Sequence, residues 1–250
     1  MTGYELRPMS VGELLDGSIA IYRNSFPVLV AIGVVTQGVP TIINAYAGLS
    51  GGFVVNPGLV LLAVVLGGIG GLLAAGATVW VISEAYLGRE ADLMDSLKYA
   101  LGRAWSLLVA GVIKYFLIGV GLILLVVPGI IVACGLAVAS QVVVLERKGG
   151  AAAIGRSWDL TKGYRGKAFV LGIIVFFLFY LPVFAFGVLA AAIPSMETIF
   201  NVGGQVLGLL IYPIIVCAFT LYYYDLRVRK EAFDLELLNR ELTGEYPVPA

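Results

Sequence analysis

Few residues in this chain have the chemistry of a catalytic or metal site. Its 250 residues include no histidine, which removes the usual general base and the commonest metal ligand. The two cysteines, Cys134 and Cys217, fall inside different apolar stretches, so we expect reduced packing residues rather than a disulfide or redox pair. The sequence motifs of zinc proteases, rhomboid-like proteases and CDP-alcohol transferases are missing. The composition therefore predicts a non-enzymatic protein with no catalytic residues, no metal and no cofactor.

Lys114 is the exception among the ionisable residues, because it lies inside a long apolar stretch. A cation near the middle of a membrane costs about 2.5–3.5 kcal/mol, so it must face a partner, a carbonyl group or a water-filled cavity. One interpretation is an intramembrane site for an anion or a lipid headgroup. The other is a lysine that reaches the interface or pairs with Glu84 or Glu146.

Other charged residues collect where the apolar stretches end. One set could join the helices through ion pairs at matching depth, and its members are Glu146, Arg156, Asp159, Asp225, Arg227 and Arg229. The alternative is a site for a lipid phosphate, with an indole in the headgroup layer, and its members are Arg156, Trp158, Lys162, Arg165 and Lys167. Both interpretations stay open on the sequence.

The elements that must position these residues are membrane spans. Hydrophobic residues make up 60% of the chain and charged residues 13%, and the mean hydropathy is +0.98. A soluble domain could not bury so much apolar surface, and several stretches are long enough to cross a hydrocarbon core of about 30 Å. We therefore expect an all-α, polytopic membrane protein with six transmembrane helices, at about 26–47, 58–82, 104–127, 129–146, 168–193 and 198–222.

The six spans group into three helical hairpins, each preceded by an amphipathic interfacial helix. The first of these helices, in 10–25, opens with a capping box of Ser10 and Glu13, and the others lie in 83–103 and 147–167. The tight reversal between the third and fourth spans is predicted at Pro128 and Gly129. Small residues in the second span predict close packing of another helix against it.

The distribution of basic residues predicts orientation. Of the 16 lysines and arginines, 15 lie on one side of the predicted membrane, and the other side has none. By the positive-inside rule both termini are cytoplasmic, in a cell membrane. We expect no cleaved signal peptide, a transmembrane domain over 1–225, and a cytoplasmic amphipathic helix and tail over 226–250.

Several segments together resemble a known family. They are LRPMSVGELLDGSIAIYRNSF, VVPGIIVA, VVVLE, AIGRSWDLTKG and YYYDLRVRKEAFDLELL. They look like the six-helix membrane domain of some bacterial glycerophosphodiester phosphodiesterases, which also occurs alone, and the resemblance covers essentially the whole chain. The phosphodiesterase chemistry belongs to a separate domain that uses histidines and metal-binding carboxylates. The resemblance therefore implies a stand-alone membrane domain of largely unassigned role, and no activity.

Two classes of function remain. The first is a non-catalytic scaffold, regulator or accessory subunit, with membrane lipids around it and a protein partner on its cytoplasmic surface helices. The alternative is a transporter or lipid-handling permease that uses a polar site around Lys114. A cavity that reaches Lys114 would favour the alternative. Nucleic-acid binding is not expected, because the basic residues are those that set topology.

Overall fold

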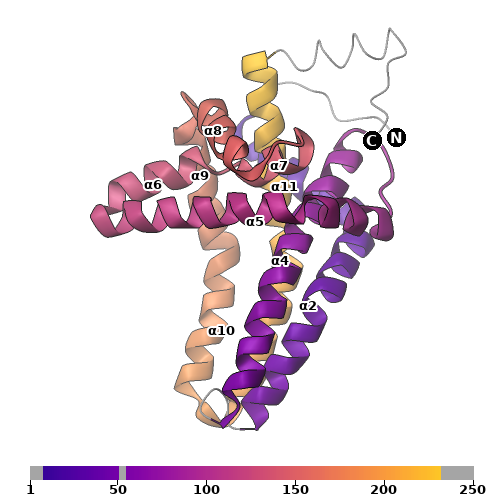
Figure 1. Ribbon diagram of the computed structural model, residues 1–250, viewed down its shortest axis with the longest axis vertical. Helices are drawn as coiled ribbons and strands as arrows, with labels where there is room; N and C mark the ends of the chain where they lie inside the picture. Colours follow the sequence, from indigo (N-terminus) through magenta and orange to yellow (C-terminus); the bar gives the residue numbers. More distant parts are fainter. Residues whose placement is uncertain (1–7, 51–54, 232–250) are drawn as a thin grey trace.

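The computed structural model describes residues 8–50 and 55–231, and every regular element in these two ranges is helical (Figure 1). In chain order the elements are α1 (Val11–Asn24), α2 (Phe26–Leu49), α4 (Pro57–Tyr86), α5 (Leu93–Leu124), α6 (Val126–Gly135), α7 (Ala139–Leu145), α8 (Gly150–Thr161), α9 (Arg165–Val175), the π-helix η1 (Phe176–Tyr180), α10 (Leu181–Ala192), the 3₁₀-helix η2 (Pro194–Met196) and α11 (Glu197–Glu231).

Helix α1 begins as its sequence predicts. The Ser10 hydroxyl accepts the amide of Glu13 at 3.3 Å, and the Glu13 carboxylate accepts the amide of Ser10 at 2.7 Å, so the capping box is confirmed. The helix buries Leu14 and Ile21 against the rest of the protein, and it packs along α11. One face of this surface helix is therefore part of the protein core.

Helices α2, α4, α10 and α11 run along the long axis of the molecule (Figure 1). Glycines bring them close together. At Gly70 of α4 an added Cβ would overlap the backbone carbonyl of Thr36 in α2, and at Gly33 of α2 it would lie 2.8 Å from Leu209 of α11. The predicted close packing of another helix against the small residues of α4 is therefore confirmed. The opposite side of α4 carries exposed apolar residues such as Leu61 and Val65.

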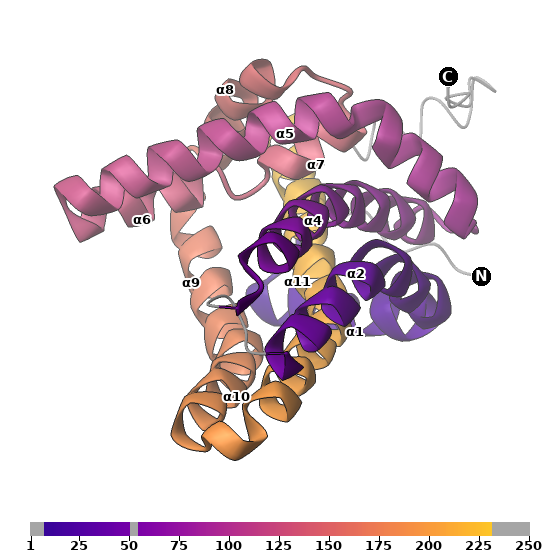
Figure 2. The same cartoon turned by 60° about the horizontal axis from the view of Figure 1, so that its bottom comes forward.

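Helix α5 combines two segments that the sequence analysis kept apart. The predicted interfacial helix in 83–103 and the third span, 104–127, are joined, because α5 runs without a break from Leu93 to Leu124. It lies across the long helices instead of alongside them, in both views of the molecule (Figures 1 and 2). The reversal into α6 occurs at Leu125, whose backbone is extended. Pro128 and Gly129 lie in the first turns of α6, where a proline without an amide hydrogen is tolerated.

The predicted fourth and fifth spans are broken helices. Residues 136–138 interrupt the fourth between α6 and α7. The fifth consists of α9, η1 and α10 and bends by 40° near Pro182. Proline removes an amide donor from the helical ladder, which accounts for the π-helical turn and the bend just before it. The predicted sixth span is α11, which continues to Glu231, and the rest of the predicted tail lies outside the described residues.

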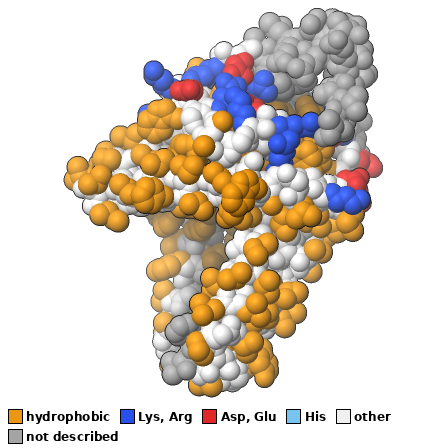
Figure 3. Space-filling view, in the orientation of Figure 1, with side chains coloured by type: hydrophobic (Ala, Val, Ile, Leu, Met, Phe, Trp, Pro, Cys, Tyr) orange, Lys and Arg blue, Asp and Glu red, His pale blue; other side chains and the backbone are white. Residues whose placement is uncertain are grey.

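The molecule is an all-α, membrane-embedded polytopic protein. In the described residues five helices are long and apolar enough to cross a membrane, and six if the bent pair counts as one span. Apolar side chains cover the visible face of the long helices and of the α5–α6 hairpin, whereas charged side chains gather over α8 and the end of α11 (Figure 3). We call that part the charged end.

Candidate functional site

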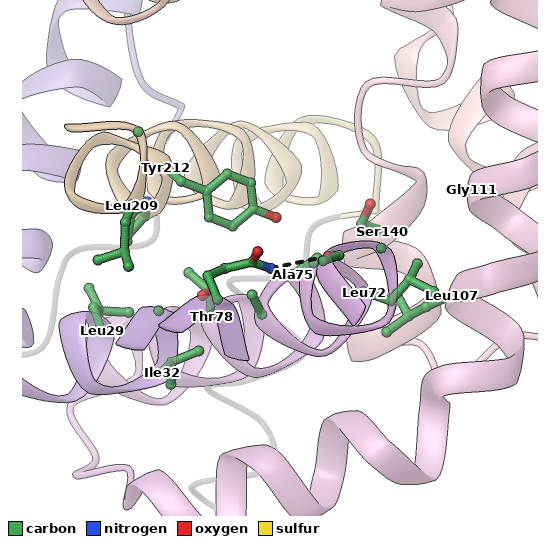
Figure 4. Close-up of a pocket in the computed structure, with 18 of the residues that line it drawn as sticks. Leu29, Ile32, Leu72, Ala75, Thr78, Leu107, Gly111, Ser140, Leu209 and Tyr212 are labelled. Atoms are coloured by element: carbon green, nitrogen blue, oxygen red, sulfur yellow. Dashed lines mark hydrogen bonds between the residues drawn. The ribbon is translucent and has the colours of Figure 1, made fainter. Parts of the chain in front are cut away.

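A cavity of about 520 Å³ opens between α2, α4, α5 and α11, with α7 at its edge. This volume lies in the range of small-molecule sites. Leu29, Ile32, Leu72, Leu107 and Leu209 form apolar walls, and Figure 4 shows the Tyr212 ring projecting from α11 into the space between the helices. Glycines in all four helices keep the walls open.

Lys114 of α5 lines this cavity. Within residues 8–50 and 55–231 it forms no ion pair and no hydrogen bond. The predicted pairing with Glu84 or Glu146 is not found: Glu84 lies 3.6 Å from Arg89, and Glu146 bonds to Arg156 at 2.8 Å. Those carboxylates sit near the charged end and are already paired with closer cations, so the structure does not bring the three residues together.

The remaining polar groups of the cavity are uncharged. They are Gln37, Thr41, Thr78, Tyr115, Ser140, Gln205 and Tyr212. Gln37 donates from Nε2 to the carbonyl of Gly67 at 3.3 Å, which fixes its amide across the α2–α4 contact. No lining residue in the described ranges is acidic. The cavity therefore carries one positive charge and neutral hydrogen-bonding groups.

Such a lining is complementary to a molecule with one anionic group and an apolar body. A cation held away from bulk water interacts more strongly with an anion than an exposed one does, because the local dielectric is low. Comparison with protein-family models, with curated proteins and with solved structures finds no match. The chemistry of the cavity is thus the main guide to function.

A second group of charged residues lies at the charged end, around Asp225. The Asp225 carboxylate is fully buried and lies 2.6 Å from Lys167 Nζ and 3.0 Å from Arg229 Nε. It also accepts the backbone amide of Met9 at 2.7 Å, and Lys167 and Arg229 both donate to the Met9 carbonyl. This Asp225 cluster fastens the start of the described chain to α9 and α11.

A third group centres on Glu146 and joins α8 to α11. Arg156 of α8 pairs with Glu146 at 2.8 Å and also with Glu231, and Glu231 in turn pairs with Arg227 at 2.9 Å. The Tyr223 hydroxyl completes the group at 3.2 Å from Glu146. Burial alone would lower the pKa of Arg156, but its hydrogen bonds to the two glutamates outweigh burial and raise the pKa. Arg156 is therefore held as the charged partner of both.

The proposed lipid-phosphate residues do not converge on one point. Arg156 and Lys167 are engaged in the two clusters above. The Arg165 guanidinium stacks 3.7 Å above the Trp158 ring, and Lys162 is exposed. The exposed Asp159 contributes its backbone carbonyl, which accepts from Lys230 Nζ at 2.6 Å. Only Arg165, Trp158 and Lys162 remain available to a headgroup.

Several cavity residues were missed by the sequence analysis, among them Gln37, Ser140 and Tyr212. Each is a polar residue within an apolar stretch, and that signal could have identified them. The described residues contain no group of three or more histidine, cysteine or acidic residues that could hold a metal ion. Cys134 and Cys217 are both free.

Proposed function

We propose that this chain is a lipid-handling permease of the cell membrane that binds an anionic amphiphile between its helices. The observation that supports the proposal is the position of Lys114, which lines the cavity without an acidic partner in the described residues. A buried cation is costly, so a cation kept at the wall of an open cavity is best explained by a ligand that compensates it.

In this proposal the protein performs no covalent chemistry. Lys114 and two uncharged polar residues of the same cavity, Ser140 and Tyr212, would hold the anionic headgroup. Leu72, Leu107 and the glycine-rich face of α4 would contact the acyl chain.

The orientation is part of the proposal. The charged end carries the basic residues of α8, α9 and the end of α11, and the positive-inside rule assigns such an end to the cytoplasm. Both termini would then be cytoplasmic.

A scaffold or accessory role is the second candidate. It is favoured by the surface at the charged end, where exposed Lys162 and Trp158 leave a basic and aromatic face available to a protein partner. It leaves the cavity and Lys114 unexplained, which is why we place it second.

Thermal unfolding of the purified protein with added amphiphiles tests the permease proposal. A ligand at a hundred times its Kd stabilises by about 2.7 kcal/mol, which corresponds to a rise in Tm of about 5–10 °C for a chain of this size. We expect this rise with lysophosphatidylglycerol, a smaller one with zwitterionic lysophosphatidylcholine, and none with inorganic phosphate alone.

Two variants and a control make the test specific. Lys114→Met should lose the rise with the anionic lipid, and Ala75→Leu should lose it for both lipids because it fills the cavity. Lys98→Met is the matched control, since Lys98 lies on the same helix with a side chain 70% exposed. An equal rise in Tm of Lys114→Met and Lys98→Met with lysophosphatidylglycerol would contradict the proposal.

A further inference from the structure

The segments Leu93–Leu124 and Val126–Leu145 are each long and apolar enough to cross a membrane, yet the α5–α6 hairpin runs across the long helices (Figures 1 and 2). The crossing point on α4 is defined by close contacts. An added Cβ at Gly76 would lie 2.8 Å from Leu107 and 3.3 Å from the backbone of Ala100, both in α5. Gly111 of α5 faces Leu72 of α4. The hairpin therefore meets α4 between Leu72 and Gly76.

The depth of this crossing follows from helix geometry. Gly76 precedes Glu84, the first acidic residue toward the charged end of α4, by eight residues, which is about 12 Å along a helix with a rise of about 1.5 Å per residue. Leu72, the other end of the contact, precedes Glu84 by twelve residues, which is about 18 Å along the helix. A hydrocarbon core is about 30 Å thick, so the crossing lies between the charged end and about the middle of the membrane.

The tip of the hairpin is apolar on every exposed side. Residues 115–145 contain no charged side chain. Ile123 is 86% exposed, and Leu124 and Leu125 are 72% and 68% exposed. Apolar surface of this extent is not stable in water, and it is continuous with the apolar surface of the long helices, on the opposite side from the charged side chains (Figure 3).

Close packing against α8 and between its own two arms holds the α5–α6 hairpin across the long helices. Its two arms touch at Gly121 and Gly129, since an added Cβ at Gly121 would lie 2.8 Å from the Gly129 backbone and one at Gly129 would lie 2.7 Å from the Leu122 backbone. The other end of α6 is tied to α8, because Ser157 and Thr161 each donate to the Gly135 carbonyl at 3.0 Å. Gly150 of α8 lies against the α5 backbone at Ser106 and Ala110. Helix α8 thus fixes both arms.

We propose that the hairpin beyond Lys114, residues 115–135, lies within the acyl chains of the membrane leaflet at the charged end and does not cross the membrane. Its partner is the lipid of that single leaflet. This inference is independent of any ligand in the cavity, because it rests on the direction of α5 and on the apolar tip.

Site-directed spin labelling of the protein in nanodiscs tests it. The background is the Cys134→Ala, Cys217→Ala variant, whose fold is first checked by circular dichroism. In it, nitroxides are placed one at a time at five exposed positions, Val112, Phe116, Val120, Ile123 and Val127. We expect the ratio of collisions with oxygen to collisions with a water-soluble nickel chelate to stay high and level through the tip. A hairpin that crosses the membrane would give a ratio that peaks near Phe116 and falls at Val127.

Labelling with a membrane-impermeant maleimide in intact membranes gives an independent answer. Ile199→Cys, at the end of the molecule away from the charged end, and Lys162→Cys, at the charged end, are the controls and should react from opposite sides. Leu125→Cys should react from neither side and should react after denaturation. Reaction from the side of Ile199 would overturn the proposal, and so would a disulfide-linked dimer through Leu125→Cys, which would show that a second copy covers the tip.

Discussion

Two lysines of this protein, Lys167 and Lys114, differ in what surrounds them. Lys167 lies at the charged end, 2.6 Å from the fully buried carboxylate of Asp225. Lys114 lies at the wall of the cavity, and no carboxylate within the described residues pairs with it. The first charge is compensated by the chain itself and holds helices together. The second has no compensating charge among the described residues.

This difference predicts opposite consequences when either charge is removed. Removing one partner of a buried pair leaves the other charge uncompensated, which costs several kcal/mol. Removing a lone cation from an apolar environment should relieve a cost instead. Substitutions in the two regions should therefore change stability in opposite directions.

The largest effect is expected at the Asp225 cluster. Asp225→Asn leaves Lys167 and Arg229 without their carboxylate and should lower the free energy of unfolding by about 3–5 kcal/mol. The change is measured by denaturant unfolding in detergent, followed by circular dichroism. Asp95→Asn is the control, because its pair with Lys98 is 3.8 Å long and exposed, and it should cost less than about 0.5 kcal/mol. Similar costs at the two positions would mean that the cluster does not hold the fold.

The next effect has the opposite sign. In protein freed of lipid, Lys114→Met should raise the free energy of unfolding by up to about 3 kcal/mol, because a cation is removed from the membrane interior. The same unfolding assay measures it. A loss of stability would show that Lys114 has a structural partner, and the contrast with Lys167 would then fail.

A smaller effect tests the close contact between α2 and α4. Gly70→Ala places a methyl group against the Thr36 carbonyl, which is backbone and cannot move aside, so we expect a loss of about 1–3 kcal/mol. Gly68→Ala, two residues away with open space around it, should be neutral or stabilising by up to about 1 kcal/mol. Equal effects of the two changes would argue against the close α2–α4 contact.

Much of the fold could be predicted from the sequence, because hydropathy reports length and composition directly. The apolar helices and the Ser10 capping box are of this kind. The sequence analysis placed the reversal at Pro128, three residues after its position at Leu125 in the structure. A proline fits the first turn of a helix as well as it fits a tight turn between helices. The predicted interfacial segment before the third span is continuous with it, because nothing in 93–124 stops the helix.

The direction of α5 and the cavity could not be predicted in the same way. Hydropathy does not say whether an apolar helix runs along or across its neighbours; here the glycine contacts at Gly76 and Gly150 decide it. The cavity joins Gln37, Lys114, Ser140 and Tyr212 from four helices. Their approach depends on tertiary packing, so the sequence could point to Lys114 alone.

Native mass spectrometry of the protein released gently from its own membrane tests the central claim, that Lys114 binds an anionic amphiphile, most directly. The wild-type protein and the Lys98→Met control should retain an anionic lipid or lipid product in a stoichiometric amount, and Lys114→Met should lose it while remaining folded. Retention of the same ligand by Lys114→Met, or a bare wild-type chain, would contradict the claim. A stoichiometric protein partner in place of the lipid would favour the scaffold role instead.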